Sequence, residues 1–145
     1  KLSSVSQTLL KKVTDVAVVN KVMIVEGKTD KQRVQEVIDE PLHIICTHGT
    51  MSVDKVDQII DDYEGQTIYV LADADDEGRK IRSWFKHYLS ESHHIYIDRQ
   101  YREVARCPKD YLGRVLERHG FEVKDEDETI QEEIDQMFER VSLLT

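Results

Sequence analysis

The amino-acid sequence predicts an α/β fold. We expect a three-layer α/β/α sandwich with a mainly parallel sheet of about four strands, and further helices at both ends of the chain. Two observations predict this class. Short apolar runs alternate with segments whose apolar residues recur at helical spacing. Strands that alternate with helices form parallel sheets through right-handed crossovers, which place helices on both faces.

The composition is typical of a soluble globular chain. With 39% hydrophobic and 34% charged residues among 145, we expect one domain with an appendage. An apolar run of about 18 residues and a secretory signal are both missing, so we predict no contact with a membrane. Cys46 and Cys107 are too widely separated for a metal-type pair, which favours free thiols in the cytoplasm.

The chain divides into three predicted parts: an N-terminal helical extension (residues 1–20), a central domain (21–100) and a C-terminal helical extension (101–145). Apolar spacing and turn residues predict the elements within them. In order, these are helix 3–16, strand 22–25, a helix from Thr29 to Pro41, strand 42–46, helix 53–63, strand 67–72, a helix from Gly78 to Leu89, strand 94–97, a helix from Pro108 to Gly120, and a C-terminal amphipathic helix from Ile130 to Val141.

Several boundaries follow from capping chemistry. Thr29, with Gln32 three residues later, resembles a capping box at a helix start. Pro108 suits the first position of a helix, and Gly120 suits the position just past its end. Strand 42–46 is rich in apolar residues, and we expect it to be buried. Trp84 and Phe85 match the core periodicity of their helix, and we interpret them as core residues rather than base-stacking ones.

Acidic residues follow two of the predicted strands. Glu26 follows the first strand, and Asp73, Asp75, Asp76 and Glu77 follow the strand at 67–72. In open parallel sheets, ligands bind outside the carboxyl ends of the strands, so we expect these acids at one rim. The turn at 47–50, which contains His48, should lie at the same rim.

Oxygen ligands in this pattern favour magnesium. Mg²⁺ is usually held by one or two carboxylates together with substrate phosphates, as in phosphoryl-transfer enzymes, and Mn²⁺ is a further possibility. Glu26 is available as general acid or base if its strand and the strand at 67–72 are neighbours. Lys28, Arg79 and Lys80 could neutralise phosphate charge.

A simpler interpretation is that the acids only stabilise a helix N-terminus. Acidic residues in the first turn do so by about 0.3–1 kcal/mol each. That interpretation covers Asp75, Asp76 and Glu77. It does not account for Asp73 at the end of a buried strand, nor for Glu26 at the equivalent end of another strand.

The motifs around these acids resemble those of the topoisomerase-primase, or Toprim, domain. The resemblance spans about residues 21 to 97 and rests on Val25–Asp30, on the DxDxE-Gly pattern of Ala72–Arg79 and on a glycine turn at Gly49. It implies that Glu26 is the general acid or base. It also implies that Asp73, Asp75 and Glu77 bind Mg²⁺.

The family includes topoisomerases, primases and nucleases. Topoisomerases and primases need additional domains that we do not expect in a chain of 145 residues, so the resemblance implies a stand-alone protein similar to the small nuclease that matures ribosomal RNA. The resemblance fixes fold and metal better than it fixes the reaction. RNA and DNA both stay open as substrates.

Charge is unevenly distributed along the chain, whose formal net charge is -9. Residues 121–145 hold nine acids and two bases, whereas residues 78–120 hold ten bases and five acids. The basic segment could carry nucleic acid or be a solvated face. The acidic terminal helix could pack or dimerise through its apolar stripe, which we favour, or cover the basic surface. A homodimer or a protein partner through the terminal helices is therefore expected.

The function predicted from these features is Mg²⁺-dependent cleavage or transfer at a phosphodiester of RNA or DNA. We expect Gly49 to contact substrate phosphate through its backbone, alongside Lys28, Arg79 and Lys80. The alternative is a non-catalytic binding or assembly module that keeps the fold. An aspartyl-phosphate phosphatase also uses a DxD pair, but after its first strand and with a threonine following, a pattern that this chain lacks.

Overall fold

The structure, a computed structural model, describes residues 19–49 and 51–144, without the side chains of residues 126, 128 and 129. The helix predicted over residues 3–16 lies outside them. The elements are β1 (Lys21–Val25), α2 (Lys28–Val37), β2 (His43–Cys46), α3 (Val53–Asp62), β3 (Thr67–Leu71), α4 (Asp76–Tyr88), β4 (His93–Ile95), the 3-10 turn η1 (Val104–Arg106), α5 (Lys109–Arg118) and α6 (Glu126–Leu144).

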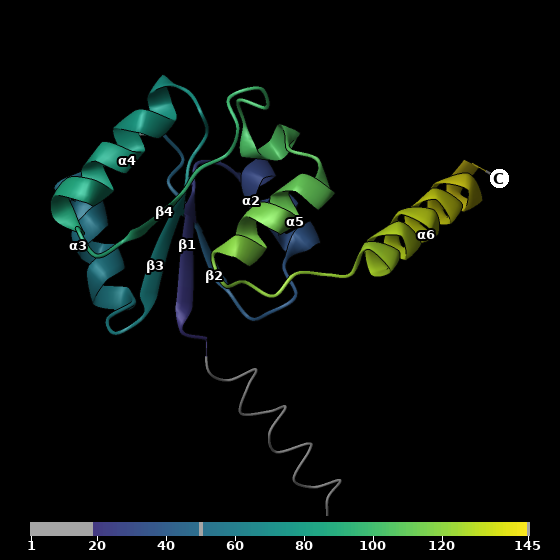
Figure 1. The fold of residues 1–145 in the computed structure, drawn as a ribbon, viewed down its shortest axis with the longest axis horizontal. Coiled ribbons are helices and arrows are strands. Elements are labelled where there is room, and N and C mark those ends of the chain that lie inside the picture. The colour runs from purple at the N-terminus through teal and green to yellow at the C-terminus, as the bar shows by residue number, and fades with distance from the viewer. Residues whose placement is uncertain (1–18, 50, 145) are drawn as a thin grey trace, which may run out of the picture.

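The four strands form one parallel sheet in the order β2-β1-β3-β4. The register pairs Ile24 with Val70 across β1 and β3, and Val25 with Cys46 across β1 and β2. The carboxyl ends of the three strands β1, β2 and β3 therefore meet at the same edge (Figure 1). This confirms the predicted α/β class and brings the predicted acidic strand ends together.

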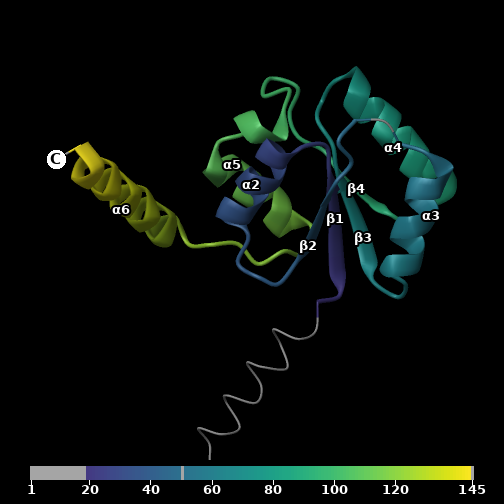
Figure 2. The ribbon, with the colours of Figure 1, turned by 180° about the vertical axis from the view of Figure 1, so that it is seen from behind.

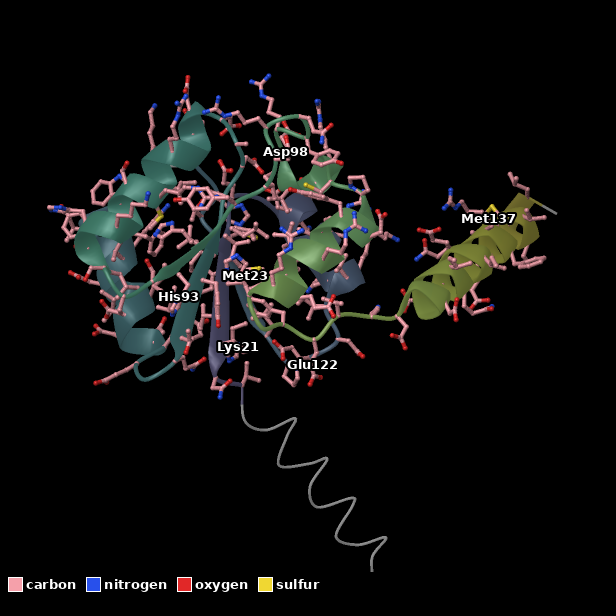
Figure 3. All side chains as sticks on the ribbon, viewed as in Figure 1. Lys21, Met23, His93, Asp98, Glu122 and Met137 are labelled. Atoms are coloured by element: carbon pink, nitrogen blue, oxygen red, sulfur yellow. The ribbon has the colours of Figure 1, made fainter. Side chains whose placement is uncertain are left out.

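Helices cover both faces of the sheet, as Figures 1 and 2 show from opposite sides. Because side chains alternate along a strand, Met23 and Val25 point to the face covered by α2 and α5, whereas Val22 and Ile24 point to α3 and α4. Figure 3 shows Met23 at the centre of the molecule. The first face also buries Val34, Leu71, Ile95, Leu112, Leu116 and Phe121, and the second buries Val56, Ile59, Val70, Ile81 and Phe85.

Local details differ from the sequence predictions. The capping box at Thr29 and Gln32 was wrong: α2 begins at Lys28 after Gly27, and the Asp30 carboxylate accepts the Gly27 N–H at 3.2 Å. Pro108 is the N-cap of α5 rather than its first residue. The predicted burial of strand 42–46 was also wrong, because β2 lies at the sheet edge and its side chains are partly or fully exposed.

The chain after β4 packs back onto α2. Helix α5 contacts α2, and Val123 forms an isolated bridge with Ile38 at the end of α2. Two backbone hydrogen bonds flank this bridge, from Asp39 N–H to the Glu122 carbonyl and from Lys124 N–H to the Val37 carbonyl, each 2.9 Å. Residues up to Lys124 are therefore bound into the core layer.

Helix α6 then projects away from the sandwich (Figure 1). Figure 3 shows Met137 far from the central sheet. Phe138 is 71% exposed, and Met137 and Val141 are more than half exposed. The apolar stripe predicted from the sequence is thus present on the helix, and it is exposed among the residues that the structure describes.

Candidate active site

Glu26 and Asp73 lie side by side although 47 positions separate them along the chain. The pairing of β1 with β3 brings their strand ends together. The Asp73 N–H donates a 2.7 Å hydrogen bond to Oε2 of Glu26. This bond orients the Glu26 carboxylate beside Asp73. The structure thereby brings two of the predicted site residues into contact.

The Asp73 carboxyl has an unusual protonation equilibrium. Burial, a hydrogen bond with the Glu26 side chain and the negative charges of Glu26 and Asp75 together raise its pKa to about 7. The N–H of Val104 opposes this shift by donating to Asp73 Oδ1 at 2.7 Å. Two carboxyl groups this close together concentrate negative charge, which a bound cation would relieve.

Asp75 and Gly78 set the start of α4 against the strand end. Asp75 is the N-cap, and its Oδ1 accepts the Gly78 N–H at 2.8 Å. Gly78 is buried so closely against the preceding turn that a Cβ added there would lie 2.0 Å from the Asp73 carbonyl oxygen. Only glycine allows α4 to begin this close to Asp73.

The segment of residues 102–105, which leads into η1, completes the site from the other side. Arg102, in the left-handed backbone region at φ 60°, accepts the Ala74 N–H at 2.7 Å through its carbonyl. The Ala105 N–H donates to Oδ1 of Asp30 at 3.0 Å. Asp30 is only 5% exposed, and burial together with the nearby Asp73 charge raises its pKa to about 6. Asp30 therefore ties the start of α2 to this segment.

A buried arginine side chain lies close to Glu26 and Asp73. Arg82 is 6% exposed, and its guanidinium donates to the carbonyls of Ala72 at 3.0 Å and Ile95 at 2.6 Å. The ring of Tyr96 lies 4.0 Å from the guanidinium carbon. Burial lowers the pKa of Arg82, whereas the charges of Glu26 and Asp73 raise it. Its positive charge therefore partly balances the acidic pair.

The remaining predicted site residues lie at different distances from this pair. Glu77 is on the first turn of α4 with a 67% exposed side chain, and it forms a 3.4 Å ion pair with Lys80. Arg79 is likewise paired with Asp76. Both bases are therefore already engaged by neighbouring acids. Lys28 is the first residue of α2 and follows Glu26 by two positions. Gly49 lies after β2 and has a φ of 104°.

Sequence reasoning missed Asp30 and Arg82. Asp30 resembled an ordinary acid in a first helical turn, and Arg82 one base among many. The only sequence signal for Arg82 was its position beside Ile81 on the core-facing side of the helix. Trp84 was only partly predicted: it packs against the core cluster, but it also stacks on exposed Tyr88 with ring centroids 5.0 Å apart.

Comparison with known proteins identifies the family. A family model described as Toprim domain matches residues 21–104. The chain belongs to the Toprim domain family. A solved structure described as a small TOPRIM domain protein from Bacillus stearothermophilus has a TM-score of 0.73 and 46% identity to this Toprim protein. That similarity covers 78% of this chain and 94% of that one.

Curated relatives of this Toprim protein include ribonucleases. YusF, an uncharacterized protein of Bacillus subtilis (strain 168), is 42% identical over 103 residues, which cover 71% of this chain and 70% of YusF. Ribonuclease M5 of Mycoplasma genitalium is 33% identical over 53% of this chain and 43% of its own. Ribonuclease M5 of Staphylococcus aureus is 30% identical over 66% and 51%, respectively. The chain thus spans about half the length of these two ribonucleases.

Toprim domains generally bind a divalent metal ion. Within residues 19–49 and 51–144, no group of three or more His, Cys, Asp or Glu side chains is arranged to hold a metal ion. The predicted ligands Asp73, Asp75 and Glu77 offer carboxylate oxygens, which suit Mg²⁺ and Mn²⁺. Since Mg²⁺ usually keeps several waters and uses one or two carboxylates, this donor set fits the ion. No helix in the described part of the chain is long and apolar enough to cross a membrane.

Proposed function

We propose that this Toprim protein is a Mg²⁺-dependent nuclease that cleaves phosphodiester bonds in nucleic acid. The adjacent Glu26 and Asp73 carboxyls carry the proposal. Glu26 is a group able to move a proton, and a bound cation would relieve the negative charge of the pair. Mn²⁺ is a possible substitute for Mg²⁺. RNA is the first substrate to test, since two of the relatives described above are ribonucleases.

The proposed roles follow from the geometry. Asp73 and Asp75, with Glu77 nearby, would hold the metal ion, which supplies charge stabilisation for a phosphoryl oxygen. Glu26 would transfer a proton to or from the reacting oxygen through the carboxylate oxygen that does not accept the Asp73 N–H. The Arg82 guanidinium would partly balance the negative charge of the acids, and the Val104 N–H would orient Asp73.

Phosphate binding is proposed for Lys28, Gly49, Arg79 and Lys80. Lys28 is exposed beside Glu26, and Gly49 offers backbone N–H in a turn that bulky residues would strain. Arg79 and Lys80 would have to leave Asp76 and Glu77 in order to contact a phosphate. Such exposed ion pairs typically contribute under about 1 kcal/mol, so breaking them to contact a phosphate costs little free energy.

The test is cleavage of labelled RNA and DNA of the same sequence, with Mg²⁺ or Mn²⁺ present. Wild type is compared with Glu26→Gln and Asp73→Asn, which keep the shape of each side chain. We expect each variant to lose about 10²-fold or more in rate, the scale of a general acid or base. Asp76→Asn is the matched control, because its 83% exposed side chain faces Arg79. Equal rates in all four proteins would refute the proposal.

The second candidate is a non-catalytic assembly module. The exposed apolar side chains of α6 favour it, because such a face on a helix that projects from the domain suits a second copy or another protein. A module of this kind needs no bound metal. If calorimetry shows no Mg²⁺ or Mn²⁺ binding, and Glu26→Gln leaves association with the partner intact, the module is favoured over the nuclease.

A further inference from the structure

A concave surface lies on the other side of Glu26 from the metal-binding residues proposed above. It has a volume of about 530 Å³, within the range of small-molecule sites. Its lining comprises two lysines, two glutamines, a cysteine and a histidine: Lys28, Lys31, Gln32, Gln35, Cys46 and His48. No lining residue is acidic, although the chain as a whole has a formal charge of -9.

The positions of these residues follow from the fold. Four of them recur along one stripe of α2 at positions 28, 31, 32 and 35, which is the i, i+3, i+4, i+7 spacing of a single helix face. Cys46 is the last residue of the edge strand β2. The His48 N–H donates to the Glu26 carbonyl at 2.9 Å, so its turn is fixed to the strand end that carries Glu26.

The two lysines on this surface are not engaged by carboxylates. Within the described residues, neither Lys28 nor Lys31 forms an ion pair, in contrast to Arg79 and Lys80 on the α4 side. A nucleic-acid phosphate can therefore bind these ammonium groups without displacing an acid. The amides of Gln32 and Gln35 offer both donors and acceptors, which suit the edge of an unpaired base.

We propose that this surface, which we call the α2–β2 subsite, binds one nucleotide of a single nucleic-acid strand next to the nucleotide at Glu26. Lys28, Lys31 and His48 hold its phosphate, and the two glutamines contact its base. The subsite deepens the proposed nuclease function and rests on it for the identity of the ligand. It explains how a strand is held where the acidic rim alone would repel it.

Binding is tested separately from cleavage. A fluorescein-labelled single-stranded RNA 12-mer is titrated with the protein in EDTA and in Ca²⁺, and anisotropy is measured over a range of salt concentrations. We expect Lys31→Gln to weaken binding about five- to tenfold and to reduce the salt slope by about 0.7, the value for one phosphate contact on a single strand. The matched control, Lys86→Gln on α4, removes the same charge and should change affinity less than about twofold.

Cys46 provides a direct readout of occupancy. Its thiol is partly exposed within the subsite, whereas the second cysteine, Cys107, is fully buried and serves as an internal reference. At an RNA concentration of about three times the wild-type Kd, bound RNA should slow maleimide labelling of Cys46 at least about threefold in wild type and in Lys86→Gln, but less than about twofold in Lys31→Gln. Equal protection in Lys31→Gln at that concentration, or none in wild type at saturating RNA, would overturn the subsite.

The two proposals can fail independently. If the protein cleaves RNA through Glu26 and Cys46 stays unprotected, the subsite is refuted and the nuclease function stands. If RNA protects Cys46 in a Lys31-dependent manner but no metal supports cleavage, the subsite stands and the nuclease function is refuted.

Discussion

Replacing Gly78 with alanine would place a Cβ atom 2.0 Å from the carbonyl oxygen, 2.9 Å from the carbonyl carbon and 3.1 Å from the nitrogen of Asp73. All three are backbone atoms, so no side chain can rotate away. Ordinary contact begins near 3.4 Å, and α4 must therefore move from the end of β3 by more than about 1 Å. The proposed metal-binding residues at the start of α4, Asp75 and Glu77, must then move with the helix.

The magnitude follows from two opposing contributions. Alanine in a helix gains up to about 1 kcal/mol over glycine. Overpacking against fixed atoms costs about 1–3 kcal/mol and sometimes more. Because the clash involves the backbone and disturbs the hydrogen bond from Gly78 to Asp75, we expect a net loss of at least about 2 kcal/mol in the free energy of unfolding. A shift of about 1 Å at the site should also reduce any cleavage rate about 10²-fold.

The assay is urea denaturation followed by circular dichroism, with Gly113→Ala as the matched control. Gly113 is also a buried helical glycine, but its added Cβ would meet only a Val37 methyl group at 3.5 Å, an ordinary contact. We expect Gly113→Ala to be neutral or stabilising by about 0.5–1 kcal/mol. If Gly78→Ala proves as stable as Gly113→Ala, the close approach of α4 to Asp73 is wrong.

Two further predictions concern pH and the terminal helix. Burial and the nearby charges of Arg82 and Lys86 lower the pKa of His94 from 6.5 to about 4. The folded state therefore favours the neutral form of this imidazole. The stability from neutral His94 is therefore complete above pH 6.5 and is lost as pH falls towards 4; because the ring is partly exposed, solvent screening should limit the loss to about 1 kcal/mol. Urea midpoints should show this loss in wild type and in the control His93→Gln but not in His94→Gln; identical profiles would contradict it. Ending the chain at Lys124 removes α6, whose side chains are largely exposed, so the unfolding free energy should change by less than about 1 kcal/mol. Sedimentation should show less self-association; an unfolded product would refute this view of α6.

The arrangement of Glu26 and Asp73 was predictable because it depends on a general rule. Parallel strands joined by right-handed crossovers present their carboxyl ends at one edge, so acids that follow two such strands converge. The apolar runs of β1 and β3 and the helical periodicity of α4 allowed these three elements to be predicted from the sequence. Glu26 and Asp73 are in direct contact because β1 and β3 are neighbouring strands in the sheet.

Other features depend on partners that sequence patterns do not identify. Arg82 is tolerated in the core because the carbonyls of Ala72, just past β3, and Ile95 in β4 accept hydrogen bonds from it. Asp30 is tolerated there because the N–H of Ala105, 75 positions later, donates to it. The edge position of β2 was hidden by an apolar sequence typical of a central strand. In each case a distant backbone group or the strand order, rather than the local residue pattern, determined the environment.

The docking of residues 102–124 against α2 affects where the chain could be cut. A fragment ending at residue 104, where the family match ends, would keep Asp73 but lose Leu112, Leu116 and Phe121. One face of its sheet would then lie open to water, and such a fragment should aggregate rather than bind metal. Residues 21–124 are therefore the shortest stretch that we expect to fold alone, and the natural unit for grafting this site onto another protein.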